Sequence, residues 1–352
     1  MQALVLAAGR GEGLLPYTLA VQKEAIRITG RAVISFPVLG LKNAGVNDFV
    51  IVVNERASQI EEALNELDVP YELVRQKSQG IEGAIRDGLA KINGDKYVLA
   101  FGDIVAPEGF YSGLLSAAAS GKDAVIALVP VVKGKETYGT VSIEGGEIRM
   151  GGSTLALGGA YVLPKAEFDN IYSFIEGLSK QNRAEFFVWS GAWVDIGYPE
   201  DLIYAVRELL EGKDSVIKKG AKVKGRAVVE LSVIEDDAEV EDYAVVKASY
   251  IGRGAYVGNF TLVRDYSSVE EGAIIGAYAE VAHSLIGRRA RVNSKAYLSY
   301  SVIGDNAEVG ANVITTSYPG RPVRGRESKI GALISPGAKV EHGKVLPPGY
   351  KA

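Results

Sequence analysis

The pattern of apolar and polar residues divides the chain into two halves. In residues 1 to about 200, short apolar runs alternate with amphipathic stretches. The apolar runs predict buried strands at 3–6, 49–53, 71–75, 97–101 and 124–130. Stretches such as 57–67 and 81–92 predict helices. This alternation is typical of a mostly parallel sheet covered by helices, and ligands of such sheets bind at the carboxyl ends of the strands.

From about residue 215 the apolar residues recur at a different period. Aliphatic residues return every six positions, with occasional steps of five. Serine-containing corners mark a longer repeat, in which the apolar residue recurs at intervals of 17, 18, 17 and 17: Ile234, Ile251, Val269, Ile286 and Ile303. Three six-residue sides make one coil of a triangular prism, so the pattern predicts a hexapeptide β-helix. An antiparallel sandwich is the alternative, but it would not keep so regular a step.

A helix is expected between the two patterns. An apolar stripe at helical spacing follows Pro199 and ends before Gly212. The predicted fold is therefore α/β. It comprises a Rossmann-like, mostly parallel sheet domain over 1–200, a connector helix over 201–214 and a β-helix over 215–352.

The composition argues against two classes of binding partner, nucleic acids and membranes. The 352 residues include 39 Lys and Arg against 43 Asp and Glu, a net charge of −4, so no basic field exists to gather nucleic acid. No apolar run approaches the roughly 20 residues of a membrane span, so no membrane partner is expected. The absence of cysteine excludes disulfides and thiolate chemistry. No signal peptide is recognised, and a cytoplasmic location is expected.

A glycine loop follows the first predicted strand, with the sequence Leu6-Ala7-Ala8-Gly9-Arg10-Gly11-Glu12-Gly13. Glycine lets backbone N–H groups approach phosphate oxygens that a side chain would block. The loop nevertheless carries an anion at Glu12 and offers no cation at Gly13.

Four motifs together resemble one family. They are the glycine loop, Lys23 after it, the Gly102-Asp103 turn that ends a predicted strand, and Trp193-Val-Asp195-Ile-Gly197-Tyr-Pro199. Together with the β-helix they are similar to the sugar-phosphate nucleotidyltransferases. The nearest likeness is the archaeal N-acetylglucosamine-1-phosphate uridyltransferase, or UDP-N-acetylglucosamine pyrophosphorylase, with a fused left-handed β-helix acetyltransferase-like domain.

The resemblance implies a catalytic group of Lys23, Asp103 and Asp195. A lysine can neutralise phosphates as a point charge, and the two aspartates correspond to the family's Mg²⁺ ligands. The chemistry agrees independently, because Mg²⁺ takes one or two carboxylates together with substrate phosphates. Nucleotide binding is expected at Leu6, Ala7, Ala8, Gly9, Gly11, Gln76 and Gly80. Sugar binding is expected at Tyr138, Gly139, Gly159 and Tyr161.

The implied reaction is Mg²⁺-dependent transfer of a nucleotidyl group from an NTP to a sugar-1-phosphate. It yields an NDP-sugar and pyrophosphate by in-line attack on the α-phosphorus, with positioning and charge neutralisation doing most of the work. Mg²⁺ is the only cofactor expected. Related hexapeptide proteins associate through their β-helices, so a homotrimer is expected as well.

Several residues depart from the family pattern. Gly13 replaces the loop arginine, Ile81 replaces a base-contacting threonine, and a sugar-binding carboxylate and amide are lost at Arg149 and Leu157. The alternative is therefore a catalytically impaired paralogue that binds nucleotide or sugar nucleotide and regulates or scaffolds a partner. Gly13→Arg with Glu12→Thr is expected to restore a cation to the loop.

Acetyl transfer by the β-helix is not expected. Tyr297 stands where the family has its histidine base, and tyrosine is a poor base at neutral pH. The two histidines of the chain are His283 and His342, and the position of His283 at a coil corner favours a packed or solvated role.

Overall fold

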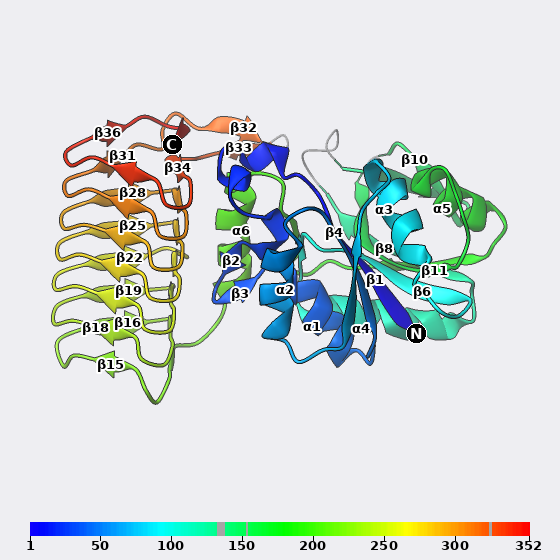
Figure 1. Cartoon of the computed structure of the whole chain (residues 1–352), viewed down its shortest axis with the longest axis horizontal. Coiled ribbons are helices and arrows are strands. Elements are labelled where there is room, and N and C mark those ends of the chain that lie inside the picture. The colour runs from blue at the N-terminus through cyan, green and yellow to red at the C-terminus, as the bar shows by residue number, and fades with distance from the viewer. Residues whose placement is uncertain (132–137, 153, 324–325) are drawn as a thin grey trace.

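The computed structural model describes residues 1–131, 138–152, 154–323 and 326–352. The first half is a nine-stranded sheet with helices on both faces, and the second half is a prism of stacked coils beside it (Figure 1). No helix within the described part of the chain has the length and apolar character that crossing a membrane requires.

The sheet of the α/β domain has the order β10-β9-β11-β6-β1-β4-β5, with β8 between β11 and β12. Its strands are β1 (Gln2–Ala7), β4 (Phe49–Val53), β5 (Tyr71–Arg75), β6 (Lys96–Phe101), β8 (Ala124–Pro130), β9 (Thr140–Glu144), β10 (Glu147–Met150), β11 (Leu155–Pro164) and β12 (Ala184–Val188). The part around β1 is parallel, as predicted. The sheet as a whole is mixed, because β11 runs antiparallel to β6, β8 and β9.

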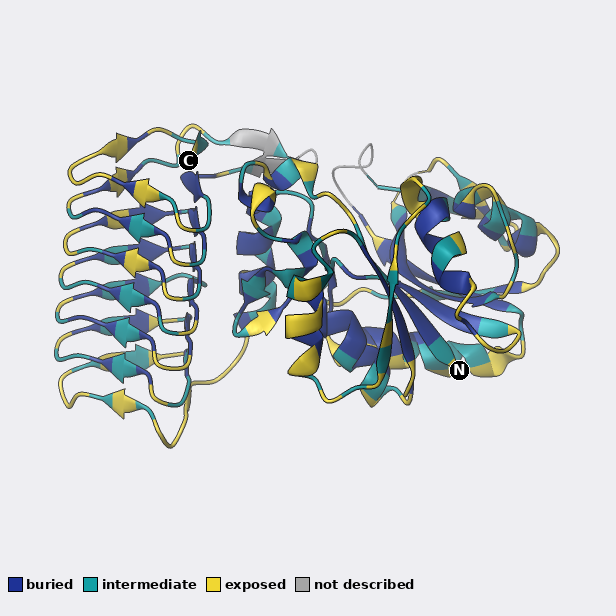
Figure 2. Cartoon of the chain, viewed as in Figure 1, coloured by how far each residue is buried: buried dark blue, intermediate teal, exposed yellow. Residues whose placement is uncertain are grey.

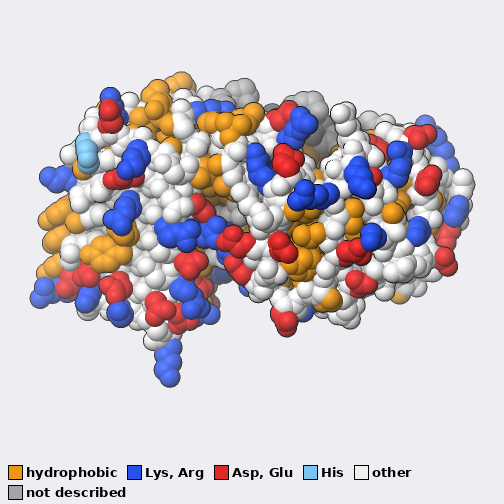
Figure 3. Space-filling view, viewed as in Figure 1, with side chains coloured by type: hydrophobic (Ala, Val, Ile, Leu, Met, Phe, Trp, Pro, Cys, Tyr) orange, Lys and Arg blue, Asp and Glu red, His pale blue; other side chains and the backbone are white. Residues whose placement is uncertain are grey.

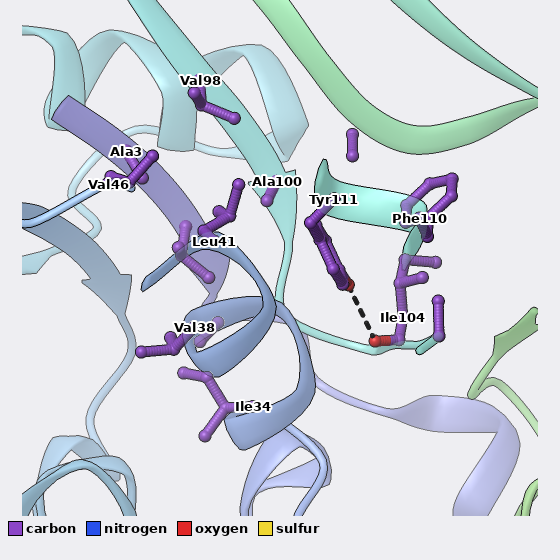
Figure 4. Close-up of a cluster of buried hydrophobic side chains, with 14 of the residues drawn as sticks. Ala3, Ile34, Val38, Leu41, Val46, Val98, Ala100, Ile104, Phe110 and Tyr111 are labelled. Carbon is purple, nitrogen blue, oxygen red and sulfur yellow. Dashed lines mark hydrogen bonds between the residues drawn. The ribbon is translucent and has the colours of Figure 1, made fainter. Parts of the chain in front are cut away.

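Five helices cover this sheet: α1 (Ser35–Asn43), α2 (Ala57–Asn65), α3 (Gly80–Leu89), α4 (Glu108–Ala117) and α5 (Ile171–Lys180). Side chains of β1 alternate between two buried clusters, with Ala3 and Val5 in one and Leu4 in the other. In the first cluster, α1 and α4 pack together and the Tyr111 hydroxyl donates to the Ile104 carbonyl at 3.4 Å (Figure 4). Helices on both faces leave the strand ends as the place for a ligand.

Short elements after β1 carry much of the site. They are the 3₁₀ turns Glu12–Leu14, Tyr17–Leu19 and Lys23–Ala25, the hairpin strands β2 (Arg27–Ile28) and β3 (Arg31–Ala32), and the pair β7 (Ile104–Val105) and β13 (Val194–Asp195). Another 3₁₀ turn, Ala118–Ser120, follows α4.

The second half is the predicted left-handed hexapeptide β-helix, built from three parallel sheets. We name each sheet after its outward side. The docking sheet packs against the α/β domain, the charged sheet carries mostly charged residues, and the open sheet is left uncovered by the described residues. The docking sheet contains β14 (Val216–Ile217), β17 (Val233–Ile234), β20 (Tyr250–Ile251), β23 (Ser268–Val269), β26 (Leu285–Ile286), β29 (Val302–Ile303), β34 (Ala332–Ile334) and β37 (Tyr350–Lys351). The charged sheet contains β15 (Lys222–Val223), β18 (Glu239–Val240), β21 (Tyr256–Val257), β24 (Ile274–Ile275), β27 (Arg291–Val292), β30 (Glu308–Val309) and β35 (Lys339–Val340). The open sheet contains β16 (Val228–Glu230), β19 (Val245–Lys247), β22 (Leu262–Arg264), β25 (Glu280–Ala282), β28 (Tyr297–Ser299), β31 (Ile314–Thr315) and β36 (Val345–Leu346).

The corners predicted from serine stack directly on one another. The backbone N–H of Ser249 donates to the Ser232 hydroxyl at 3.1 Å, and the same contact recurs up the stack at 3.3, 3.2 and 3.0 Å. The apolar residue two positions after most of these serines points into a continuous buried core. Between β31 and β34 the chain leaves the coils in a small hairpin of β32 (Arg321–Val323) and β33 (Arg326–Ser328).

The connector is α6 (Pro199–Leu210), which begins two residues before the predicted segment. It lies between the α/β domain and the β-helix (Figure 1). Its residues Leu202, Val206 and Leu210 belong to a buried cluster that also includes Leu285 and Val302 of the docking sheet. The two halves therefore share a hydrophobic core, and Figure 2 shows buried residues on both sides of their boundary.

Candidate functional site

The glycine loop leaves β1 in the parallel part of the sheet, and side chains hold it from behind. Four of its carbonyl oxygens accept side-chain hydrogen bonds: Ala7 and Gly9 from Gln22 at 3.2 and 2.8 Å, Ala8 from Asn54 at 3.3 Å, and Gly11 from Thr18 at 2.8 Å. Gly11 is left-handed, with φ of 64°. Because these carbonyls are engaged with the protein, the loop is fixed in shape before any ligand arrives.

Lys23 reaches from its 3₁₀ turn to Asp103, which lies just beyond the end of β6. Their Nζ and carboxylate oxygen are 2.5 Å apart, and the two side chains are only 11% and 19% exposed. Burial alone would lower the pKa of Lys23. The carboxylates of Asp103, Glu24 and Asp195 outweigh it and raise that pKa above its ordinary value. The lysine therefore stays charged at the carboxyl end of β6.

Gly102 brings the Asp103 turn against the glycine loop. Its N–H donates to the Leu6 carbonyl at 2.8 Å. A Cβ at this position would lie 2.6 Å from the same carbonyl oxygen, so only glycine allows the approach.

Asp195 enters from the neighbouring strand pair. β13 runs antiparallel to β7, with Asp195 opposite Ile104, and the N–H of Ile196 donates to the Asp103 carbonyl at 3.0 Å. The structure thus brings together Lys23, Asp103 and Asp195, which lie far apart in the sequence. Among the described residues no cluster of three or more His, Cys, Asp or Glu side chains is arranged to hold a metal.

Glu24 is a site residue that sequence reasoning missed. Its side chain is 2% exposed and accepts a hydrogen bond of 2.6 Å from the Gln22 amide. A Cβ on Gly9 would lie 3.6 Å from one of its carboxylate oxygens, so the group faces the glycine loop. Burial raises the pKa of Glu24 to about 7, with Lys23 opposing the shift and Asp103 adding to it. No period or motif marks this position, because an acidic residue beside a lysine ordinarily lies at the surface.

The expected base-binding turn follows β5 and is well braced. Gln76 donates through its amide to the carbonyls of Ser78 and Gly80, at 2.7 and 2.9 Å. The Asp87 carboxylate accepts from the N–H groups of residues 77 and 78 at 2.5 and 2.9 Å. Ile81 follows this turn in the first turn of α3 and is exposed.

The residues expected to bind sugar divide into two groups. Tyr138 packs edge-on against Trp193, with ring centroids 5.8 Å apart. The Gly139 carbonyl accepts from the Leu157 N–H at 3.0 Å. Tyr161, in contrast, is buried in the core, where its hydroxyl accepts a hydrogen bond from the Gly159 N–H at 3.3 Å. Gly159 itself is left-handed, with φ of 74°.

The place of the expected loop arginine is occupied by protein. A Cβ on Gly13 would lie 2.2 Å from the Gly197 carbonyl oxygen and 3.2 Å from the Tyr198 ring. That turn is fixed by Asp201, which accepts from the N–H groups of Gly197 and Tyr198 at 3.0 and 2.7 Å. The effect of Gly13→Arg stays a prediction, and the structure adds a condition to it: this turn must move to admit any side chain at residue 13.

Comparisons with known proteins find relatives along the length of this chain. Residues 2–151 match the family model described as "Nucleotidyl transferase". The chain is 27% identical to the bifunctional protein GlmU of Methanocaldococcus jannaschii, over 92% of this chain and 83% of that protein. It is 26% identical to a bifunctional sugar-1-phosphate nucleotidylyltransferase/acetyltransferase of Sulfurisphaera tokodaii, over all of this chain and 94% of that protein.

Solved structures show the same fold for the first half. The inositol-1-phosphate CTP transferase from T. maritima superposes with a TM-score of 0.51 at 21% identity, and the match covers 60% of this chain and 96% of that one.

Proposed function

We propose that this chain transfers a nucleotidyl group from an NTP to a sugar-1-phosphate, because residues 2–151 match the nucleotidyl transferase family model. The products are an NDP-sugar and pyrophosphate. The observation that carries the proposal is the meeting of the glycine loop with Lys23, Asp103 and Asp195 beside the ends of β1 and β6.

In this reaction an oxygen of the sugar-1-phosphate forms a bond to the α-phosphorus of the nucleotide, and the bond from that phosphorus to the bridging oxygen breaks. The N–H groups of residues 7–11 cradle the triphosphate. Lys23 supplies positive charge where negative charge concentrates. A rigid loop and a fixed cation act by positioning and by charge stabilisation, the two effects that dominate phosphoryl and nucleotidyl transfer.

Asp103 and Asp195 are the residues that would hold Mg²⁺. The donor set fits, because Mg²⁺ is bound by one or two carboxylates with substrate phosphates and water completing its shell. Bound there, the ion would neutralise phosphate charge and orient the reacting oxygens. Lys23, hydrogen-bonded to Asp103, holds its charge between these carboxylates and the loop.

Base and sugar recognition rest on fewer polar contacts than the family pattern implies. Gln76 and Gly80 shape the base turn, but the Ile81 side chain has no hydrogen-bonding group. We therefore expect preference for UTP over other nucleotides to stay below a hundredfold, about 2.7 kcal/mol. On the sugar side, Tyr138 and Gly139 are the residues expected to contact the sugar, while the Tyr161 hydroxyl holds Gly159 from the core.

A second candidate is an impaired paralogue that binds nucleotide or sugar nucleotide without turning it over. Two observations favour it. The turn at Gly197 fills the place of the loop arginine, and the buried Glu24 adds a carboxyl group beside the phosphate loop. The first leaves the loop without a cation and the second adds an acidic group. Both disfavour the binding of anionic ligands.

One experiment separates the two candidates. Pyrophosphate release is measured with Mg²⁺ over a matrix of nucleotides and sugar-1-phosphates, for the wild type and for Asp103→Asn. The first candidate predicts release that needs both substrates and is lost in the variant. If no pair gives release above that of the variant while calorimetry shows nucleotide binding, the impaired paralogue stands.

Acetyl transfer is not part of the proposal. Tyr297 lies partly exposed on the open sheet. The His283 ring stacks on Tyr300 with centroids 4.3 Å apart, and burial lowers the pKa of His283 despite Asp265 nearby.

The proposal includes a homotrimer formed through the open sheet. Its outward column is mostly apolar, with Val228, Tyr297, Ile314 and Val345 exposed. Along the adjoining corner, the rings of Tyr243, Phe260 and Tyr278 stack at 4.9 and 5.0 Å and are exposed. Figure 3 shows hydrophobic side chains gathered on this outer edge of the β-helix. Exposed apolar groups of this kind favour contact with another protein surface, and the ion pairs Lys247–Glu230 and Arg264–Glu280 lie on the same sheet.

A further inference from the structure

A hairpin of the α/β domain inserts its tip into the docking sheet of the β-helix. β2 and β3 pair antiparallel with Ile28 opposite Arg31, so the tip consists of Thr29 and Gly30. The Gly30 N–H donates to the Glu270 carboxylate at 2.9 Å, and the Thr29 N–H donates to the Ser268 hydroxyl at 3.2 Å. Figure 1 shows this hairpin on the side of the domain that faces the β-helix.

Glu270 binds the tip from a fully enclosed position. Its residue is 0% exposed, and its second carboxylate oxygen accepts from the Ser268 hydroxyl at 2.6 Å. A buried carboxylate is costly unless hydrogen bonds satisfy it. One of these donors, the Gly30 N–H, comes from the other half of the chain, so Glu270 and the hairpin tip depend on each other.

The tip has a conformation that needs such support. Both residues are left-handed, with φ of 50° at Thr29 and 82° at Gly30. A β-branched residue in this region is a genuine outlier, which persists only where its surroundings determine it. Glycine is required at residue 30, because a Cβ there would lie 2.2 Å from the Tyr250 hydroxyl of the docking sheet.

The base of the same hairpin carries the charged site. The Ile34 N–H donates to the Glu24 carbonyl and the Val33 N–H to the Ile26 carbonyl, both at 2.9 Å. These bonds continue the pairing from the tip back to the turn that holds Lys23. Displacing the tip therefore moves the backbone next to Lys23, with no flexible segment between them.

The hairpin and the aspartate strands also share one hydrophobic cluster. Ile28 and Val33 pack in the same buried group as Val105, Val194 and Ile196, which flank Asp103 and Asp195. The cluster includes Leu285 and Val302 of the docking sheet. The β-helix thus supports both sides of the site from behind.

We infer that Glu270, a residue of the β-helix, is a positioning residue for Lys23 in the nucleotidyl-transfer site. The inference rests on the proposed function for its consequence in activity and on the contacts above for its geometry. Glu270 touches no substrate, and acts by fixing the hairpin whose base presents Lys23 to Asp103.

The test compares three variants of the full chain: Glu270→Ala, Glu270→Gln and Glu271→Ala. Glu271 is the neighbouring exposed glutamate and serves as the control. Glu270→Ala should lower kcat/KM for the nucleotide about tenfold to a hundredfold, because catalytic geometry tolerates little displacement. Glu270→Gln keeps an oxygen acceptor for the Gly30 N–H and should restore most of the activity. Equal activity of Glu270→Ala and Glu271→Ala would overturn the inference.

A second measurement keeps the inference testable without turnover. Amide hydrogen exchange is followed by mass spectrometry across residues 23–34. In Glu270→Ala, exchange should quicken from the tip at 29–30 back to the base at 23–26. Faster exchange confined to the tip would show that the two ends are uncoupled. If the wild type gives no pyrophosphate with any substrate, the proposed function fails, and this exchange pattern alone decides the inference.

Discussion

The docking sheet and the open sheet of the β-helix have the same repeat and similar outward residues, yet opposite surroundings. Tyr250, Leu285 and Val302 of the docking sheet are buried beneath the α/β domain. Ile314 and Val345 of the open sheet are exposed. Apolar residues on the outer face of the β-helix are therefore buried only where another surface packs against them. This contrast is the ground for proposing that the open sheet meets another copy of the chain.

The largest effect should come from matched truncations on the two faces. Leu285→Ala on the docking sheet should lower the free energy of unfolding by about 2–5 kcal/mol, as for other buried leucines. Leu262→Ala, the open-sheet counterpart, should cost less than about 1 kcal/mol in the monomer. Urea denaturation followed by fluorescence measures both values.

The dependence of these values on protein concentration sharpens the comparison. The cost of Leu262→Ala should grow with concentration if the open sheet is an interface, whereas that of Leu285→Ala should not. Equal costs on the two faces at every concentration would break the distinction between them.

Activity should depend on the docked side far more than on the open side. Lys23→Met should reduce the rate of pyrophosphate release about 10²–10³-fold, by analogy with the loss of one transition-state donor. Lys247→Met removes a lysine of the open sheet that pairs with Glu230 at the surface, and it should leave the rate unchanged. A steady-state assay with saturating Mg²⁺ decides this. If both variants lose activity, the cause is a disturbed assembly and not the loss of the Lys23 charge.

Assembly should depend on the open side more than on the docked side. Phe260→Asp places a charge within the exposed aromatic stack and should convert the proposed trimer, of about three times 37.4 kDa, into a monomer. Melting temperature should change little, because Phe260 is exposed within its own chain. Light scattering at micromolar concentration measures the mass. A wild type that is already monomeric there would contradict the trimer.

The smallest effect concerns pH and lies at the docked interface. Burial raises the pKa of Glu270 from 4.5 to about 7, and the nearby Asp305 adds to the shift. The Tyr17 and Tyr250 phenols also face this group, with Arg288 alongside, and the pKa values of both phenols are raised mainly by burial. The folded chain therefore holds the Glu270 proton more tightly than the unfolded chain.

The sign of the pH effect follows from that difference. The stabilisation is complete below about pH 4.5 and is lost as pH rises through about 7. Glu270→Gln cannot titrate, so its melting temperature should fall less than that of the wild type across this window. Glu24, whose pKa is also raised to about 7, keeps some dependence in both proteins. Parallel melting curves would show that Glu270 does not titrate there.

Much of the fold is readable from periodicity. The strands predicted at 49–53, 71–75 and 124–130 have these bounds in the structure. Those at 49–53 and 124–130 are buried apolar runs. The prediction that 71–75 is buried was wrong, because β5 lies at the edge of the sheet and carries Glu72 and Arg75. The β-helix follows from a repeat in which each coil contacts only its neighbours. The antiparallel course of β11 was missed, since a fully buried strand has the same pattern in either direction.

The site was predictable only where a motif carried it. Asp103 and Asp195 stood out in the sequence, and they come together because β13 pairs with β7. Glu24 and Glu270 did not stand out, because an acidic residue gives no sign of burial until the fold encloses it. The crowding around Gly13 was not predictable either, because the turn that lies against it is more than 180 residues further along the chain.

The serine corners determine which insertions and deletions the β-helix can accommodate. Along the serine corners each coil rests on the one before it through a backbone N–H that donates to a serine hydroxyl, so adding or removing one whole coil preserves the contacts between the remaining coils. Insertions of other sizes must loop outward, as β32 and β33 do. Coils from β20 to β34 are pinned by the α/β domain, whereas the first coil, with Val216 exposed, is not. A repeat gained or lost at the first coil would therefore leave the contacts of the hairpin next to Lys23 unchanged.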